Sequence, residues 1–382
     1  MASGRKAQAW LAHSKAFGSP CGTFSGYTVA FPAWSIDVDP STALPLVEGL
    51  RSLQERIQRT VIEQLRARDA EAMAQVAKDT GGDIIYSIDA DIEEVLLEFC
   101  DDWSGRLAQV GNLRHFVLIA EGLGEEDRRA FPEGLDPADA DFFVIIDPID
   151  GTRPLMYDKR SAWSLAAIVP NSGGAPRLRD AVAACMTELP TSKQGCADCL
   201  YAVRGRRPTL ERRNLITGEA VERPYSPSRA DHIEHGFAML VNFFPGGKEV
   251  VSAIEEELVR ELRAVRRGRS VVFSDQYLST GGQFYELIVG HDRFNGDLRG
   301  RMIERQLPRG AVPALAAHPY DCCAELLARE AGVIITDIDG RPFDAPLDTE
   351  SPVSWLGYAN EALRRTIEPV LQRLLRKHGL ID

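Results

Sequence analysis

The feature of this sequence that most constrains its fold is an apolar run that ends directly in acidic residues. Residues 141–146 (DFFVII) predict a buried strand, because the run is short and rich in aromatic and β-branched side chains. The run continues into residues 147–152 (DPIDGT), which place two carboxylates and a hydroxyl at the end of that strand. Carboxylates beside a buried strand are costly unless something binds them, so the segment predicts a site for a hard cation. For the hexapeptide alone, the alternative interpretation is a plain turn with a helix cap.

Other acidic residues stand at comparable places. Residues 115–120 (HFVLIA) predict a second buried strand that ends at Glu121, and Asp89 follows the apolar segment 84–88. Asp321 precedes a predicted helix at 324–331, and taken alone it is better explained as a helix cap than as a ligand. Together these carboxylates offer the oxygen ligands that two or three Mg²⁺ ions require.

The remaining pattern predicts layers of helices and strands. The chain has 382 residues, which is long for a single core, so we expect two packed halves. Apolar periodicity predicts helices at 47–65, 91–99, 251–262 and 363–374, and short apolar runs predict strands at 163–169, 271–273 and 333–335. Residues 204–229, rich in Arg, Pro and Thr, predict a β-hairpin or a surface excursion. We expect an N-terminal extension at 1–40, with a short strand within 27–36, followed by domains at 41–225 and 226–382.

Composition argues against several classes of partner. The net charge is −12, from 44 Lys and Arg against 56 Asp and Glu, which disfavours binding to nucleic acids and anionic membranes. No apolar run has the length of a membrane span or the form of a signal peptide, so we expect a cytoplasmic, reducing location.

The 7 cysteines are scattered. Cys196 and Cys199 form one CxxC without a second pair, so ordinary thiols are the default and zinc is the lesser alternative.

Four segments resemble, in the same order, the motifs of the inositol monophosphatase family of lithium-sensitive, magnesium-dependent phosphatases. Residues 147–152 are similar to its DP(I/L)DG(S/T) signature, and the resemblance spans residues 45–360. The other matching segments are residues 83–89 (DIIYSID), residues 290–299 (GHDRFNGDLR), and Asp321 with residues 324, 330–332 and 340–344.

The sequence departs from the family pattern at several of these positions. Tyr86 stands in place of Thr, Tyr320 in place of Trp, Cys323 in place of Ala and Glu325 in place of Gly. The family's Glu-Glu pair corresponds to Glu121-Gly122, and an alternative register uses Glu125 and Glu126.

The resemblance implies a fold of the α+β / α/β class, a layered αβαβα sandwich of the sugar-phosphatase type. It implies that magnesium is held by Glu121, Asp147, the carbonyl of Ile149, Asp150 and Asp321. It implies catalytic roles for Glu121 and Thr152 in orienting the attacking water, and for Asp89 in holding a metal through water. The backbone N–H groups of Gly151 and Thr152 would cradle the phosphate, and Asp297 would contact substrate hydroxyls. Arg299 pairs either with an anionic group of the substrate or with Asp297.

The implied activity is magnesium-dependent hydrolysis of a phosphate monoester of a small metabolite, either an inositol monophosphate or a sugar phosphate. Fructose 1,6-bisphosphate and a phosphoadenosine nucleotide are alternative substrates. A homodimer is implied only by the resemblance. An alternative of another class is a metal-binding regulatory protein that has lost catalysis, and the presence of Glu121 with Thr152 argues against it.

Overall fold

The computed structural model describes residues 40–67, 76–79, 84–110, 113–123, 126–265, 267–307 and 312–382. The side chains of residues 40–42, 76–79, 84–91 and 108–110 are not described. All described residues belong to one compact unit, Val38–Asp382. The expected strand within 27–36 lies outside the described residues, as does the expected extension up to residue 39. The domain boundary expected between residues 225 and 226 stays a prediction.

An eight-stranded sheet holds the predicted buried strands and presents the acidic residues at one edge. Its order is β10-β9-β8-β7-β6-β5-β3-β4. β3 (Phe116–Ile119) runs parallel to β5 (Phe142–Asp150), so Glu121 and Asp147 are delivered to the same edge of the sheet. All other neighbours in the sheet are antiparallel. The remaining strands are β4 (Arg128–Phe131), β6 (Ala162–Pro170), β7 (Ala183–Leu189), β8 (Cys196–Val203), β9 (Thr209–Asn214) and β10 (Ala220–Glu222).

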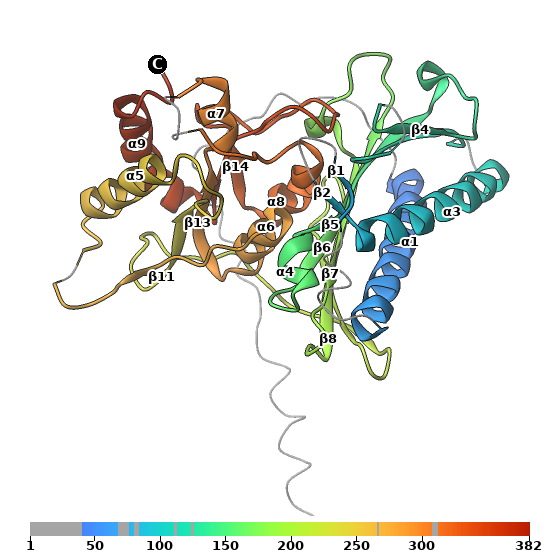
Figure 1. Cartoon of the computed structure of the whole chain (residues 1–382), viewed down its shortest axis with the longest axis horizontal. Coiled ribbons are helices and arrows are strands. Elements are labelled where there is room, and N and C mark those ends of the chain that lie inside the picture. Colours follow the sequence, from blue (N-terminus) through green and yellow to red (C-terminus); the bar gives the residue numbers. More distant parts are fainter. Residues whose placement is uncertain are drawn as a thin grey trace, which may run out of the picture. The chain divides into compact units, whose positions relative to one another are not determined.

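Two long helices, α1 (Pro40–Ala67) and α3 (Ser87–Val110), cover one face of this sheet (Figure 1). α1 buries an apolar stripe against the sheet, as its periodicity predicts. Trp103 of α3 packs on Phe116 and Phe142, with ring centroids 5.2 and 6.2 Å apart. A small antiparallel pair, β1 (Val76–Asp79) and β2 (Ile84–Tyr86), precedes α3.

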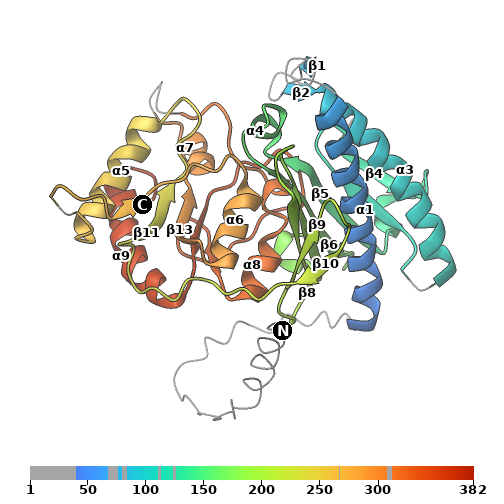
Figure 2. The ribbon, with the colours of Figure 1, turned by 90° about the horizontal axis from the view of Figure 1, so that it is seen from below.

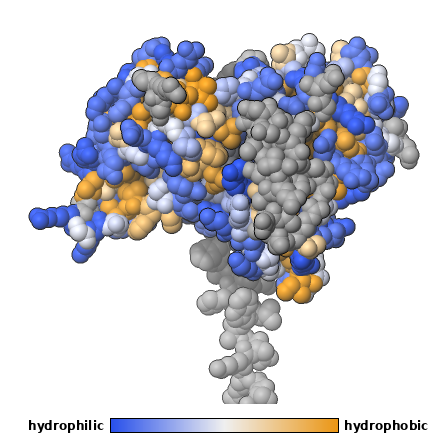
Figure 3. All heavy atoms as spheres, in the orientation of Figure 1, coloured by the Kyte–Doolittle hydropathy of each residue, from blue (hydrophilic) through white to orange (hydrophobic). Residues whose placement is uncertain are grey.

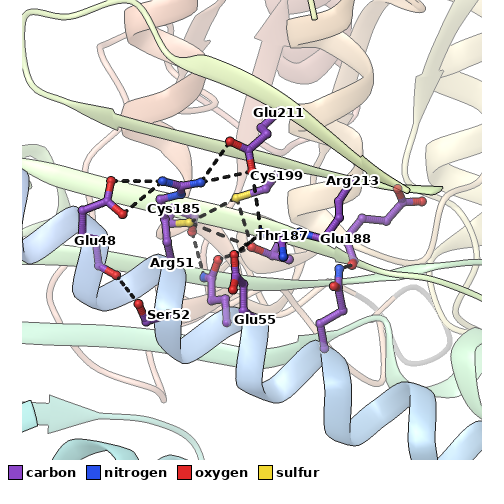
Figure 4. Close-up of polar contacts among 12 residues, drawn as sticks. Glu48, Arg51, Ser52, Glu55, Cys185, Thr187, Glu188, Cys199, Glu211 and Arg213 are labelled. Carbon is purple, nitrogen blue, oxygen red and sulfur yellow. Dashed lines mark hydrogen bonds and ion pairs between the residues drawn. The ribbon is translucent and has the colours of Figure 1, made fainter. Parts of the chain in front are cut away.

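Polar contacts also join α1 to the sheet (Figure 4). Gln54 donates to the carbonyl of Cys185 at 3.0 Å and accepts from the hydroxyl of Thr187 at 2.8 Å. The sulfur of Cys199 lies 3.8 Å from that of Cys185 on the neighbouring strand, whereas Cys196 is exposed. Within the described ranges this cluster does not bring three metal-ligating groups together. Both cysteines of the CxxC are free thiols on β8.

A second sheet of five strands forms the other half, in the order β12-β11-β13-β15-β14. β12, β11 and β13 are parallel, and β15 is antiparallel to β13 and β14. These strands are β11 (Gly236–Leu240), β12 (Val272–Phe273), β13 (Asp292–Asp297), β14 (Ile334–Thr336) and β15 (Trp355–Tyr358). The helices α5 (Lys248–Glu261) and α9 (Glu361–Lys377) pack together on one of its faces.

Helices α6 (Thr280–Val289) and α8 (Glu325–Ala331) lie between the two sheets and contact both (Figure 2). The layers are therefore α1 and α3, the first sheet, α6 and α8, the second sheet, and α5 and α9. This arrangement confirms the expected αβαβα sandwich. The short elements are α4 (Thr152–Met156), α7 (Arg299–Glu304), η1 (Pro137–Asp139), η2 (Leu178–Asp180) and η3 (Tyr320–Cys322).

The surface seen in Figure 3 is mostly hydrophilic where it is described, with hydrophobic residues gathered near β11. The exposed apolar side chains include Phe237 and Phe273, whose ring centroids are 5.9 Å apart. No helix in the described part of the chain is long and apolar enough to cross a membrane.

Candidate metal centre

A pocket of about 250 Å³ opens at the edge of the first sheet where β3 and β5 end. It is lined by most of the residues that the sequence singled out: Glu121, Asp147, Ile149, Asp150, Gly151, Thr152, Arg299 and Asp321. The side chain of Asp89 lies outside the described residues. Asp297 does not line the pocket.

Three carboxylates converge in this pocket. One oxygen from each of Asp147, Asp150 and Asp321 lies within 4.8 Å of the others. The first two come from the end of β5 and the third from η3. Asp321 does not cap α8, because the N-cap of that helix is Ala324 and no side chain caps it. Instead, its carboxylate accepts the backbone N–H of His318 at 2.7 Å. The structure therefore brings Asp321 to the β5 acids instead of leaving it as a helix cap.

Asp150 is anchored by the start of α6, a contact that the sequence did not predict. Its carboxylate accepts from the hydroxyl of Ser279 at 2.8 Å and from the backbone N–H groups of Gly281 at 2.6 Å and Thr280 at 3.2 Å. Ser279 is also the N-cap of α6. The Ser-Thr-Gly-Gly segment thus marks a helix start, as the default interpretation of the glycines holds, but its partner could not be inferred.

Burial raises the pKa of every carboxyl in the cluster. It raises the pKa of Asp150 to about 6 and that of Asp321 to about 7. The pKa of Asp147 lies well above its ordinary value, because burial is reinforced by the charges of Asp150 and Asp321. The guanidinium of Arg299 lowers the pKa of Asp150 and Asp321 but does not offset burial.

The donor set fits a hard divalent cation. Its members are carboxylate oxygens, the ligands that Mg²⁺ and Ca²⁺ prefer, and Ile149 lines the same pocket. Burial, reinforced at Asp147 and Asp321 by the charges of neighbouring carboxylates, disfavours the ionised forms, and a bound cation would reverse that effect. Among the described residues, this is the one group of three or more acidic, His or Cys side chains arranged to hold a metal.

Glu121 reaches the same pocket from the loop after β3. Its carboxylate accepts a hydrogen bond from the hydroxyl of Tyr320 at 2.9 Å. Burial raises the pKa of Tyr320 well above its ordinary value. In the alternative register, Glu126 is exposed and does not line the pocket, and Glu125 lies outside the described residues.

Gly151 and Thr152 form the turn after β5. Gly151 has φ of 98°, and a Cβ there would lie 2.9 Å from the carbonyl oxygen of Leu278, so the position requires glycine. The hydroxyl of Thr152 donates to the carbonyl of Ile149 at 2.9 Å. With its proton used in this way, the Thr152 oxygen can accept a hydrogen bond from a water molecule.

Arg299 and Asp297 form a buried ion pair. Nε and Nη2 of Arg299 donate to the two oxygens of Asp297 at 2.6–3.0 Å. The Asp297 side chain is 1% exposed and is not among the residues that line the pocket, so its expected contact with substrate hydroxyls stays a prediction. The guanidinium also lies 5.0 Å and 5.2 Å from the ring centroids of Phe243 and Phe244. Of the two alternatives for Arg299, the structure shows its pairing with Asp297.

Several pocket residues carried no signal in the sequence pattern. Phe243, Phe244 and His318 line the pocket, yet each stands in a segment without a motif. Tyr320 was visible only as a departure from the family's Trp.

Solved structures similar to this one include proteins named as a fructose-1,6-bisphosphatase, an inositol monophosphatase and an extragenic suppressor protein. The chain matches no protein-family model, and no curated protein matches it. Its structure is similar to a Leishmania major fructose-1,6-bisphosphatase, with 11% identity, a TM-score of 0.57, and coverage of 87% of this chain and 93% of that one. It is similar to an inositol monophosphatase–fructose 1,6-bisphosphatase, with 15% identity, a TM-score of 0.56, and coverage of 86% and 98%. It is also similar to the extragenic suppressor protein SuhB of Bartonella henselae, with 15% identity, a TM-score of 0.55, and coverage of 86% and 99%.

These likenesses confirm the resemblance that the motifs predict at the level of the fold. The chain has the layered fold of the inositol monophosphatase and fructose-1,6-bisphosphatase superfamily. At such low identity the likeness establishes the fold alone.

Proposed function

We propose that this protein is a divalent-metal-dependent phosphatase that hydrolyses a phosphate monoester of a small metabolite. The observation that carries the proposal is the convergence of Asp147, Asp150 and Asp321 within 4.8 Å, in a pocket that Glu121 and Thr152 also line. The similar structures named as fructose-1,6-bisphosphatase and inositol monophosphatase support the same reaction class.

In this proposal Mg²⁺ is held by Asp147, Asp150, Asp321, Glu121 and the carbonyl of Ile149. When bound, the cation supplies a reactive water at neutral pH and neutralises charge on the phosphate. Glu121 and the Thr152 oxygen would each accept a hydrogen bond from the attacking water and so orient it. The backbone N–H groups of Gly151 and Thr152 orient the phosphate, and lithium sensitivity is expected with such a site.

The pocket favours a small substrate. Its volume of about 250 Å³ is at the low end for a ligand site, which suits a polyol or sugar monophosphate better than a nucleotide. Arg299 lines the pocket near Phe243 and Phe244, and it contributes a positive charge beside the acidic residues. We therefore propose an inositol monophosphate or a sugar phosphate as substrate. Fructose 1,6-bisphosphate and a phosphoadenosine nucleotide are the alternative substrates to be compared with them.

The test is an assay of phosphate release from these four classes of ester after removal of metal with a chelator, with and without added Mg²⁺. We expect release that requires Mg²⁺ and falls by at least about a thousandfold in Asp147→Asn, because the substitution keeps the shape of the side chain and removes a ligand charge. Asp139→Asn, an exposed carboxylate of η1, is the matched control and should retain full activity. Mg²⁺ binding without release from any ester would instead support the metal-binding regulatory protein.

A further inference from the structure

Tyr320 lies in the pocket wall and is held rigidly there. Its side chain is buried, and its ring stacks on that of His318 with centroids 5.7 Å apart and an interplanar angle of 15°. The backbone position of Tyr320 is also defined, because Tyr320 is the first residue of η3. Asp321 belongs to the same short turn. Both rings line the pocket.

Glu121 lies in a less regular part of the chain than Tyr320 does. It follows the end of β3 in a turn, and the residue as a whole is exposed. A glutamate side chain has several rotatable bonds, so an exposed one loses considerable freedom when it is held in one orientation. The hydroxyl of Tyr320 donates to its Oε2 at 2.9 Å across a chain separation of 199 residues.

We propose that Tyr320 is a positioning residue that holds the Glu121 carboxylate toward the Asp147, Asp150 and Asp321 cluster, so that the cation meets four preorganised carboxylates. This inference rests on the proposed function, because it assigns a role within the same metal centre. One turn, η3, then sets two ligands: it carries Asp321 directly, and it fixes Glu121 through the hydrogen bond from Tyr320.

The chemistry of the position supports this role. A hydrogen bond that orients a ligating carboxylate typically changes metal affinity or activity by about 10–100-fold when it is removed. The tyrosine is also a departure from the tryptophan of the family motif that residues 321–332 resemble. The hydroxyl of a tyrosine projects from the tip of the ring. The N–H of a tryptophan projects from the side of the indole ring, so it would point in a different direction.

The test uses Tyr320→Phe in the full chain, with direct titration of Mg²⁺ by calorimetry and steady-state kinetics on the preferred ester. We expect Mg²⁺ affinity to fall about 10–100-fold and kcat at saturating Mg²⁺ to fall by a similar factor, with KM changed by less than about threefold. The matched control is Tyr358→Phe, a buried tyrosine of β15 that packs on Phe294 and does not line the pocket. It should change neither quantity.

A double-mutant cycle separates positioning from general structural support. In a Glu121→Gln background, Tyr320→Phe should weaken Mg²⁺ binding by less than about threefold further, because the carboxylate it orients is already gone. Full additivity in this cycle, or unchanged Mg²⁺ affinity in Tyr320→Phe, would overturn the inference. If the wild type binds Mg²⁺ but hydrolyses no ester, the proposed function fails while the titrations still decide the role of Tyr320. If the wild type binds no Mg²⁺, both are overturned.

Discussion

Asp321 is half-buried beside the buried carboxylates of Asp147 and Asp150, and its pKa of about 7 influences how the metal-free protein responds to pH. An unfolded aspartate has a pKa of about 3.9. Between these values the folded chain binds more protons than the unfolded chain, so the free energy of unfolding decreases as pH rises. The stability that protonation provides is complete at low pH and is lost once pH passes the folded value. Asp150, with a pKa of about 6, acts in the same direction.

We therefore expect the metal-free protein to lose stability between pH 5 and pH 8, as measured by urea unfolding at fixed ionic strength. In Asp321→Asn the free energy of unfolding should fall less steeply with pH. One titrating group is removed, and its negative charge no longer acts on the neighbouring carboxylates. Saturating Mg²⁺ should flatten the slope in the wild type. An identical slope in wild type and Asp321→Asn would show that these carboxylates do not govern it.

The same substitution should separate stability from function. At pH 8 without metal, Asp321→Asn should melt at a higher temperature than the wild type, because a repulsive buried charge is gone, yet it should release no phosphate. Asp292→Asn offers a matched control, since Asp292 is also buried, has a pKa raised to about 6 and does not line the pocket. It should keep phosphate release within about threefold of the wild type, and an equal loss there would argue against the assigned centre.

At this scale the sequence predicted the residues whose position follows from the strand that precedes them. Glu121 and Asp147 each follow an apolar run, so the edge of the sheet could be inferred locally. Ser279 and Tyr320 could not be assigned, because their partners Asp150 and Glu121 lie 129 and 199 residues away in the chain. The sequence left two partners open for Arg299, and the structure shows its hydrogen bonds to Asp297.

Among the elements, α6 has the most direct influence on the site. Its first backbone N–H groups bind Asp150, and its helix begins with two glycines that are poor helix formers. Close packing explains why glycine occupies position 281, because a Cβ there would lie 2.4 Å from Leu165 Cδ2 on β6. Close packing of α6 on the sheet is thus what brings its N–H groups to Asp150.

Gly281→Ala should push α6 away from β6 and weaken both packing and the contact with Asp150. We expect a loss of about 1–3 kcal/mol in the free energy of unfolding, together with weaker Mg²⁺ binding by calorimetry. The control is Gly105→Ala in α3, where a new Cβ has no heavy atom within 4 Å. That change should stabilise the protein by about 0.5–1 kcal/mol. Equal Mg²⁺ affinity in the wild type and Gly281→Ala would count against the role of α6.

The elements that could be predicted from the sequence are those with strong periodicity of their own, such as α1, α5 and α9, and the apolar strands β3, β5 and β6. The structure starts α1 at Pro40 and α3 at Ser87, earlier than the apolar pattern indicates. β7 (AACMTEL) was missed because its small and polar residues have weak strand preference. It is a strand because β6 and β8 pair with it on both edges.

At the scale of the whole molecule, the five layers place the pocket where both halves contribute to it. Asp147 and Asp150 come from the first sheet, whereas Asp321 belongs to the chain beyond β13. A cation that binds these residues binds only the folded state, so it stabilises the assembly of all five layers.

Mg²⁺ should therefore raise the melting temperature of the whole described unit in one transition. At a free concentration of 100 times Kd, one ion contributes about 2.7 kcal/mol, which corresponds to about 4 °C for a chain of this size. Differential scanning calorimetry measures the shift, and Asp147→Asn should abolish it. Two separate transitions, of which only one responds to Mg²⁺, would show that the halves unfold independently.

The hydrogen bond between Glu121 and Tyr320 has a consequence for how the protein is made. Tyr320 is 199 residues later in the chain than Glu121. At a synthesis rate of about 5–20 residues per second, the acidic edge of the first sheet leaves the ribosome about 10–40 s before the turn that completes it. During most of that interval the nascent chain carries Asp147 and Asp150 without Asp321 and without the α6 amides. Under the proposed function, the cation site would therefore be completed late in biosynthesis, and we expect a chain truncated before residue 320 to bind Mg²⁺ weakly.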